Sequence, residues 1–282
     1  MACAERINTA PKGGERGGGR ACAPPRSPGL VSYSTSGTHT GSVDHRGIWL
    51  RLDPVRSRLR RMRGSVLCTS DRLEVDSLRG GVRLRRLFLT LTYRPSEVDS
   101  VGDISAFRDR MRQWFKRRGA VCRFVWVREA HKSGRPHFHV LVWLPRSLRL
   151  PAADACGWWP HGMTNTQVVH SGAAYLAKYL SKVSSLSSAA FPKGCRIHGS
   201  GGLSVRSRWD RRWFLSPRWV RESLGAGADP VRVRGGWADR LSGCFVRSPW
   251  SLVKGGGGVF WVCRPFQLGE SCNASSSQVR FA

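Results

Sequence analysis

Two histidines separated by one residue, His137 and His139, carry the strongest chemical signal in the sequence. They open a short apolar run rich in Val, Leu and Trp, which is typical of a buried strand. The segment 121–129 is also strand-like, and Ser133-Gly134 predicts a turn between the two segments. Side chains alternate along a strand, so both imidazoles are expected on one face. If the hairpin is symmetric about that turn, Glu129 lies opposite His137.

These three side chains would form a metal site with two imidazoles and one carboxylate, and with positions left open for water or a phosphate oxygen. The alternative is that both histidines are partly buried and hydrogen-bonded, with no metal between them.

A second candidate cluster lies further along the chain, in the run 172–183, which has helical periodicity with Ser171 as a candidate N-cap. At about 100° per residue, two tyrosines and two lysines share one side of this helix: Tyr175, Lys178, Tyr179 and Lys182. The aliphatic residues Leu176, Leu180 and Val183 fall on the opposite side. A phenol has a pKa of about 10, and a neighbouring ammonium favours the phenolate and can hold a phosphate. The alternative is a helix whose tyrosines only pack.

The residues of these clusters resemble a known family. His137-Phe138-His139 resembles the metal motif of the HUH endonucleases. Tyr175-x-x-Lys178-Tyr179-x-x-Lys182 resembles the two-tyrosine motif of rolling-circle replication initiators from single-stranded DNA phages, and the stretch 87–93 matches their first motif. The stretches 158–165 and 191–194 resemble replication initiation proteins of filamentous phages. The resemblance covers roughly residues 68–221, and three motifs in the family's order are more specific than any one of them.

The resemblance implies a site-specific DNA endonuclease and strand transferase. It implies Mg²⁺ or Mn²⁺ at the scissile phosphate, held by His137, His139 and Glu129. It also implies a covalent 5′-phosphotyrosine intermediate on a helix whose catalytic residues are Tyr175, Tyr179, Lys178 and Lys182.

The substrate implied by the resemblance is single-stranded DNA or melted replication-origin DNA, and the free 3′ hydroxyl would prime rolling-circle synthesis. A host helicase and polymerase are further candidate partners, in the cytoplasm of a bacterial host. A two-tyrosine transposase or a plasmid relaxase would use the same chemistry. A non-catalytic module that binds single-stranded nucleic acid is an alternative from another class.

The composition fits a polyanionic partner. The sequence has 47 Lys and Arg against 18 Asp and Glu, for a formal net charge of +29. Phosphate contacts would dominate affinity at such a charge, although an arginine excess can also reflect coding bias. Nine cysteines without a Cys-x-x-Cys pair favour reduced thiols, and Cys195-x-x-His198 is only a weak zinc half-site. No apolar run approaches the length of a membrane span, so no membrane partner is expected.

The pattern of elements predicts an α+β fold, with a mostly antiparallel sheet and helices over one face, as in HUH/Rep, ferredoxin-like or RRM-like cores. The predicted elements are a strand at 84–93, a helix at 103–118, the hairpin at 121–144, a strand at 164–169 and the tyrosine helix. Three regions follow from composition: a disordered basic arm rich in Gly, Pro and Ser at 1–65, the nuclease domain at 66–222, and a Gly-rich, partly ordered extension at 223–282.

Two features outside the core are less specific. A basic helix is predicted over 54–62, and a last strand over 259–263. Aromatic residues alternate with arginines over 206–220, which could stack unpaired bases or close a small core.

Overall fold

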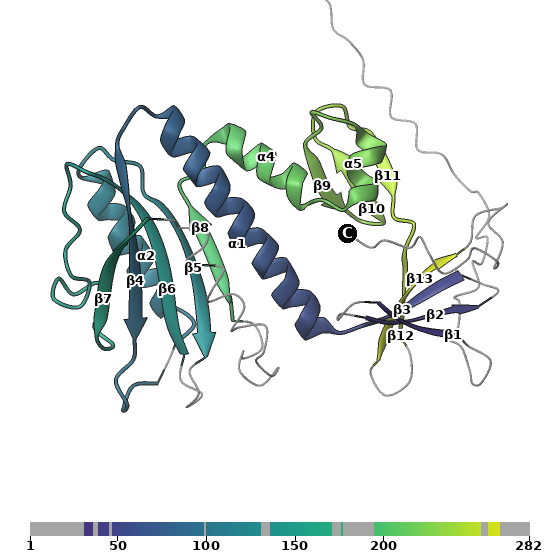
Figure 1. The fold of residues 1–282 in the computed structure, drawn as a ribbon, viewed down its shortest axis with the longest axis horizontal. Coiled ribbons are helices and arrows are strands. Elements are labelled where there is room, and N and C mark those ends of the chain that lie inside the picture. The colour runs from purple at the N-terminus through teal and green to yellow at the C-terminus, as the bar shows by residue number, and fades with distance from the viewer. Residues whose placement is uncertain are drawn as a thin grey trace, which may run out of the picture. The chain divides into compact units, whose positions relative to one another are not determined.

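The computed structural model describes residues 31–35, 39–44, 47–98, 100–130, 136–170, 176, 195–254 and 259–265. They form two compact units, one containing residues 39–52 and the C-terminal strands, the other containing residues 53–249 (Figure 1). In the part of the chain that the structure describes, no helix is long and apolar enough to cross a membrane.

A five-stranded antiparallel sheet is the centre of the larger unit, with strand order β7-β4-β6-β5-β8. Its strands are β4 (Leu84–Thr92), β5 (Arg123–Ala130), β6 (Pro136–Pro145), β7 (Thr164–Val169) and β8 (His198–Gly201). The first four lie where the sequence predicts strands, and the α+β class with a mostly antiparallel sheet is confirmed.

Helices cover both faces of this sheet, which corrects the prediction that they lie over one face (Figure 1). Helix α2 (Asp103–Lys116) packs Phe107, Met111 and Phe115 against one face. Helix α1 (Pro54–Arg79) packs against the other. Both layers are needed because β6 is buried on both sides from Phe138 to Leu144, so neither face can be left to water.

Helix α1 extends the predicted basic helix at 54–62 by more than four turns. Asp53 caps it by accepting hydrogen bonds from the backbone N–H groups of Val55 and Arg56, both at 2.9 Å. Its buried stripe mixes apolar residues with small polar ones: Leu59, Met62, Ser65, Val66, Thr69, Ser70 and Leu73. Because serines and threonines stand where an apolar period would show, the sequence pattern conceals the length of this helix.

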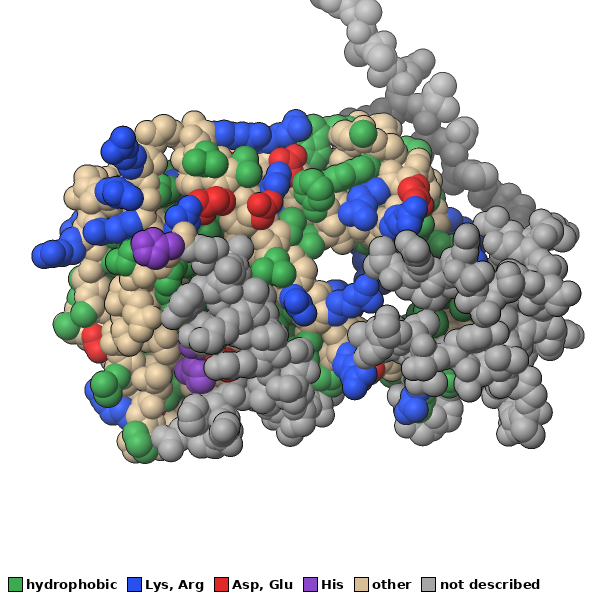
Figure 2. Space-filling view, in the orientation of Figure 1, with side chains coloured by type: hydrophobic (Ala, Val, Ile, Leu, Met, Phe, Trp, Pro, Cys, Tyr) green, Lys and Arg blue, Asp and Glu red, His purple; other side chains and the backbone are tan. Residues whose placement is uncertain are grey.

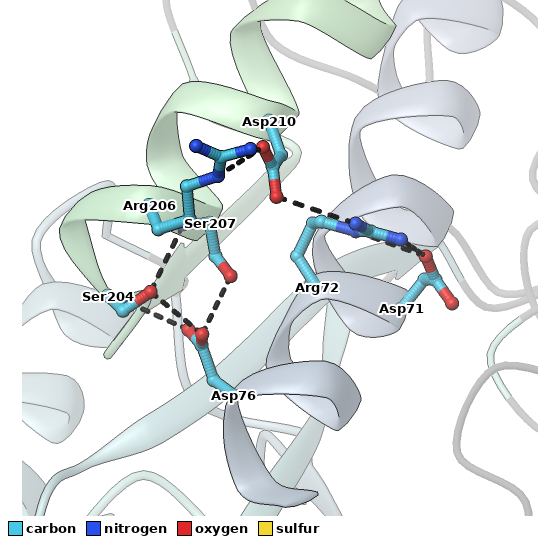
Figure 3. Close-up of polar contacts among 7 residues, drawn as sticks. All are labelled: Asp71, Arg72, Asp76, Ser204, Arg206, Ser207 and Asp210. Carbon is cyan, nitrogen blue, oxygen red and sulfur yellow. Dashed lines mark hydrogen bonds and ion pairs between the residues drawn. The ribbon is translucent and has the colours of Figure 1, made fainter. Parts of the chain in front are cut away.

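A buried carboxylate joins α1 to helix α4 (Val205–Leu215), as Figure 3 shows. Asp76 accepts hydrogen bonds from the backbone N–H and hydroxyl of Ser204 and from the hydroxyl of Ser207, each at 2.7 Å. Ser204 is itself the N-cap of α4 and accepts from the N–H of Ser207. One side chain of α1 thereby sets where α4 begins.

The Arg-aromatic segment at 206–220 spans α4 and helix α5 (Arg218–Leu224). Phe214 is half-exposed, and the Arg72 guanidinium lies 5.2 Å from its ring centroid. Arg212 of α4 makes a bidentate ion pair with Asp229, just before a small sheet of β9 (Pro230–Val233), β10 (Gly236–Asp239) and β11 (Phe245–Arg247). These contacts pack much of the segment against its neighbours.

The other unit is a sheet with strand order β1-β2-β3-β13-β12. Its strands are β1 (Val31–Thr35), β2 (His39–Asp44), β3 (Gly47–Leu52), β12 (Ser251–Lys254) and β13 (Phe260–Pro265). Three of them lie within residues 31–52, which corrects the prediction of disorder there. Their Ser, Thr and Gly content gives a weak local signal, and β3 pairs with β13 from the far end of the chain.

The predicted region boundaries also fall inside helices. The boundary at 65 lies within α1, and the boundary at 222 lies within α5. The last predicted strand, at 259–263, corresponds to β13. Residues 1–30 and the stretch 191–194 lie outside the described residues.

Candidate metal site

The β5–β6 hairpin has the predicted register. Glu129 pairs with His137, and Val127 pairs with His139. Paired and alternate residues share a face, so both imidazoles and the carboxylate lie on the α1 side of the sheet. Phe138 points the other way, into the core beneath α2, where its ring centroid is 5.7 Å from that of Trp126.

The three side chains converge on one point. Oε2 of Glu129 lies 3.1 Å from Nε2 of His137 and 2.7 Å from Nε2 of His139. All three candidate ligand atoms lie within 4.8 Å of one another. Glu129 and His139 are buried and His137 is half-buried, so the cluster is open to solvent only on the His137 side.

Glu129 is held as a carboxylate. Burial raises its pKa, but hydrogen bonds from His137 and His139 lower it more, and the net pKa of Glu129 is about 2. Two imidazole nitrogens and one carboxylate oxygen form a donor set that suits divalent transition metals such as Mn²⁺ and also accepts Mg²⁺ or Zn²⁺. A bound cation would take the place of the imidazole protons that Glu129 now accepts. The residues therefore fit a metal site, and the geometry does not select the metal.

Strand β4 supports His139 from the next position in the sheet. Thr90 pairs directly with His139, and its hydroxyl oxygen lies 3.3 Å from Nδ1. If Nδ1–H donates to Thr90, the lone pair of Nε2 is free to bind a cation. The ring of Phe88 stacks on the imidazole at a centroid distance of 5.2 Å and an angle of 24°. The sequence marks 87–93 as a motif, but it does not single out these two residues.

The segment 158–165 closes the end of β4 beside the site. Trp159 donates its indole N–H to the carbonyl of Thr92 at 2.8 Å, and the hydroxyl of Thr92 donates to the carbonyl of Met163 at 2.8 Å. Gly162 leaves no room for a side chain, because a Cβ there would lie 2.3 Å from the Thr92 carbonyl oxygen. This segment therefore fixes the end of the strand that carries Thr90.

The predicted nucleophile residues lie outside the described residues: Tyr175, Lys178, Tyr179 and Lys182. Leu176, next to Tyr175 in sequence, is described. It is helical and fully buried, in the same apolar cluster as Phe88 and Leu141 on the α1 side of the sheet. Its burial agrees with the aliphatic side predicted for this helix.

The Cys195-x-x-His198 half-site does not gather ligands among the described residues. His198 Nε2 lies 3.1 Å from the hydroxyl of Ser65, and Cys195 is buried in the cluster under α1. Within the same part of the chain, Glu129, His137 and His139 are the one group of three or more His, Cys, Asp or Glu residues close enough to share a metal ion.

Comparison with known proteins gives one match. Residues 86–184 match the model of a family described as replication-associated protein, ORF2 type. Searches of curated proteins and of solved structures found no significant match to this chain. The matched residues run from β4 through the candidate metal site and β7 to the tyrosine segment. The part of the chain that carries the Glu129–His137–His139 cluster is thus similar to the replication-associated proteins of the ORF2 family.

Proposed function

We propose that this protein is a metal-dependent, HUH-type endonuclease that nicks and rejoins single-stranded origin DNA in rolling-circle replication. The observation that carries the proposal is the convergence of Glu129, His137 and His139 on one sheet face. This cluster lies within the segment that is similar to replication-associated proteins. The formal charge of +29 supports a nucleic-acid substrate.

His137, His139 and Glu129 would hold Mg²⁺ or Mn²⁺, which supplies Lewis-acid stabilisation of the charge that develops on the scissile phosphate. Thr90 keeps the His139 imidazole in the tautomer that presents Nε2, and Phe88 limits the rotation of its ring. The half-buried edge at His137 is where a phosphate could enter, because Glu129 and His139 are closed to solvent.

Tyr175 and Tyr179 are the proposed nucleophiles. The phenol oxygen loses its proton and attacks phosphorus, an O–P bond to tyrosine forms, and the bond from phosphorus to the 3′ oxygen breaks. The 3′ oxygen takes up a proton and leaves as a free hydroxyl, while the 5′ phosphate stays on the protein. Attack by a 3′ hydroxyl reverses these changes, so rejoining needs no ATP.

The proposed roles of Lys178 and Lys182 are to favour the phenolate and to hold the phosphate. Two tyrosines would allow alternating cleavage and joining at one metal site. The burial of Leu176 against Phe88 and Leu141 supports this proposal, because these residues lie on the sheet face that carries His139.

The test is covalent capture of DNA. A labelled single-stranded oligonucleotide carrying the origin sequence should become attached to the full-length chain in Mn²⁺ and should survive denaturation. The His137→Ala/His139→Ala double variant should bind the oligonucleotide but form no adduct. Replacing His170, which is exposed and lies outside the cluster, should leave the adduct unchanged. Undiminished cleavage by the double histidine variant would contradict the metal assignment.

The alternatives separate in the same system. Release of a circular single-stranded product at a cognate origin supports replication initiation, whereas insertion into a second DNA points to a transposase. Binding without any cleavage would leave a non-catalytic nucleic-acid-binding module.

A further inference from the structure

A groove lined by arginines lies between α1 and the β8 edge of the central sheet. Its lining residues are Arg58, Arg61, Arg196, Ile197 and His198. They come from α1 and from the residues that lead into β8, and none belongs to the segment matched by the replication-associated family. We call these five residues the basic groove.

The register of the sheet places the basic groove beside the candidate metal site. His139 pairs with Val127, and Val127 pairs with His198, so the three residues form one row across β6, β5 and β8. Neighbouring strands are about 4.8 Å apart, which puts His198 about 10 Å from His139. One residue before His198, Ile197 accepts a hydrogen bond from the N–H of Arg128, the neighbour of Glu129. The groove and the cluster therefore lie at the same end of the sheet.

The arginines of the groove keep their charge available. No carboxylate in the described part of the chain lies within ion-pair distance of Arg58, Arg61 or Arg196. Arg61 and Arg196 are exposed, and Arg58 is fixed by donating to the carbonyl of Cys195. Figure 2 shows Lys and Arg side chains prevailing over acidic ones on this face of the molecule.

The groove also contrasts with other arginine clusters on α1. Arg72 is paired with Asp71 and Asp210, and Arg86 of β4 is paired with Glu74. Those guanidiniums hold the helix to its neighbours. Three guanidiniums that share a groove without a carboxylate from the described residues repel each other, and an arrangement of this kind is stabilised when an anion binds between them.

We propose that the basic groove binds the sugar-phosphate backbone of the DNA strand on one side of the scissile phosphate. Arg61 and Arg196 contact phosphates, and Arg58 lines the groove between them. The groove reads no base, because guanidiniums on phosphates fix the register of a strand without reading sequence. This inference rests on the proposed function and extends it by naming where the substrate lies beyond the metal cluster.

Binding without metal tests the groove independently of cleavage. The probe is a fluorescein-labelled dT20 oligonucleotide in buffer containing EDTA, measured by anisotropy at several salt concentrations with the full-length chain. Arg61→Ala/Arg196→Ala should weaken binding about 10-fold or more and should reduce the log–log salt slope by about 1.4, since each phosphate contact on a single strand contributes about 0.7. The matched control is Arg60→Ala/Arg63→Ala, which removes two exposed arginines that do not line the groove.

Equal losses in the two double variants would overturn the groove, because they would mean that only total charge matters. The same conclusion would follow from a groove variant that binds dT20 as tightly as the wild type. A groove variant that loses affinity while the His137→Ala/His139→Ala variant retains it would support the groove even if no nicking were found, so the failure of each proposal is separable.

Cleavage kinetics locate the groove relative to the nick. With an origin oligonucleotide extended on both sides, the groove variant should show a KM raised about 10-fold and an unchanged kcat. With the flank on the groove side removed, wild type and variant should have the same KM. An equal KM difference for every truncated substrate would contradict the placement beside the metal cluster.

Discussion

His139 Nε2 lies 2.7 Å from Glu129 Oε2, although the strand register pairs His139 with Val127 and pairs Glu129 with His137. The closer of the two imidazole contacts is therefore the diagonal one. Diagonal neighbours across an antiparallel pair are within reach of long side chains, and the twist of a hairpin brings one diagonal closer than the other. This relationship makes a three-ligand cluster out of a two-residue pairing.

The cluster should bind a divalent metal through Glu129. Glu129→Gln removes the charged oxygen on which both imidazoles converge, so Mn²⁺ affinity should fall by about 100-fold or more and nicking should be lost. Titration calorimetry with Mn²⁺ measures the affinity directly. Glu222→Gln, at an exposed pair with Arg218, is the control and should bind Mn²⁺ as the wild type does. Unchanged Mn²⁺ affinity in Glu129→Gln would exclude this residue as a ligand.

Thr90 should tune the site without binding the metal. Thr90→Val keeps the shape of the side chain but removes the oxygen that lies 3.3 Å from Nδ1 of His139, so Mn²⁺ affinity should fall by about 10-fold. Thr90→Ser retains a hydroxyl and should recover most of that loss. Calorimetry on the three proteins distinguishes the hydroxyl from packing, and equal losses in the valine and serine variants would refute the orienting role.

The two tyrosines should be interchangeable for a first cleavage. They would lie about 6 Å apart along a helix axis at 1.5 Å per residue, so one metal could serve both. Tyr175→Phe and Tyr179→Phe should each retain some adduct formation and fail at repeated strand transfer, while the double variant should form no adduct. Lys178→Ala should slow adduct formation without preventing it.

Mass spectrometry of the denatured adduct identifies the attached residue. An adduct in the double tyrosine variant, or hydrolysis without any adduct in the wild type, would replace this mechanism with that of an ordinary metal-dependent nuclease.

Stability should fall at mildly acidic pH because of His198. Burial, with the nearby Arg211 of α4 and Arg58 of α1, lowers the pKa of His198 to about 4 from an ordinary value near 6.5. The unfolded chain thus takes up a proton that the folded chain refuses, so the stability present above pH 6.5 is lost as pH falls towards 4. Ser65, the other neighbour of the imidazole, is uncharged.

Urea unfolding at pH 7.5 and at pH 5 measures this effect. His198→Gln should lower the pH dependence of the midpoint between these conditions, whatever it does to the midpoint itself. His170→Gln, at an exposed position, should retain the wild-type dependence. A His198→Gln variant with the full wild-type dependence would assign the acid sensitivity to other groups.

Asp76 should hold α4 against α1. Asp76→Ala leaves the donors of Ser204 and Ser207 without their buried acceptor, so the free energy of unfolding should fall by about 3 kcal/mol. Asp71→Ala, on the same helix but at a largely exposed pair with Arg72, should change it by about 0.5 kcal/mol or less. Urea titrations of both variants provide the comparison, and equal effects would show that the carboxylate does not link the helices.

The sequence by itself determined the hairpin and the shared face of its ligands. A period of two fixes which side chains lie together, and a short turn fixes the register, so His137, His139 and Glu129 could be placed from local pattern alone. The strands at 84–92 and 164–169 and the helix from 103 were predictable for the same reason, because apolar periodicity and end signals are local.

Only the tertiary structure decided what surrounds that hairpin. Thr90 and Phe88 reach His139 because β4 pairs with β6, a pairing of distant segments that no local pattern specifies. Helix α1 covers the second sheet face with buried serines and threonines, whose polarity hid it, and its Arg58 and Arg61 meet Arg196 only once α1 and β8 are packed. Local periodicity records which face a residue takes, whereas the partner on that face is chosen by packing across the whole chain.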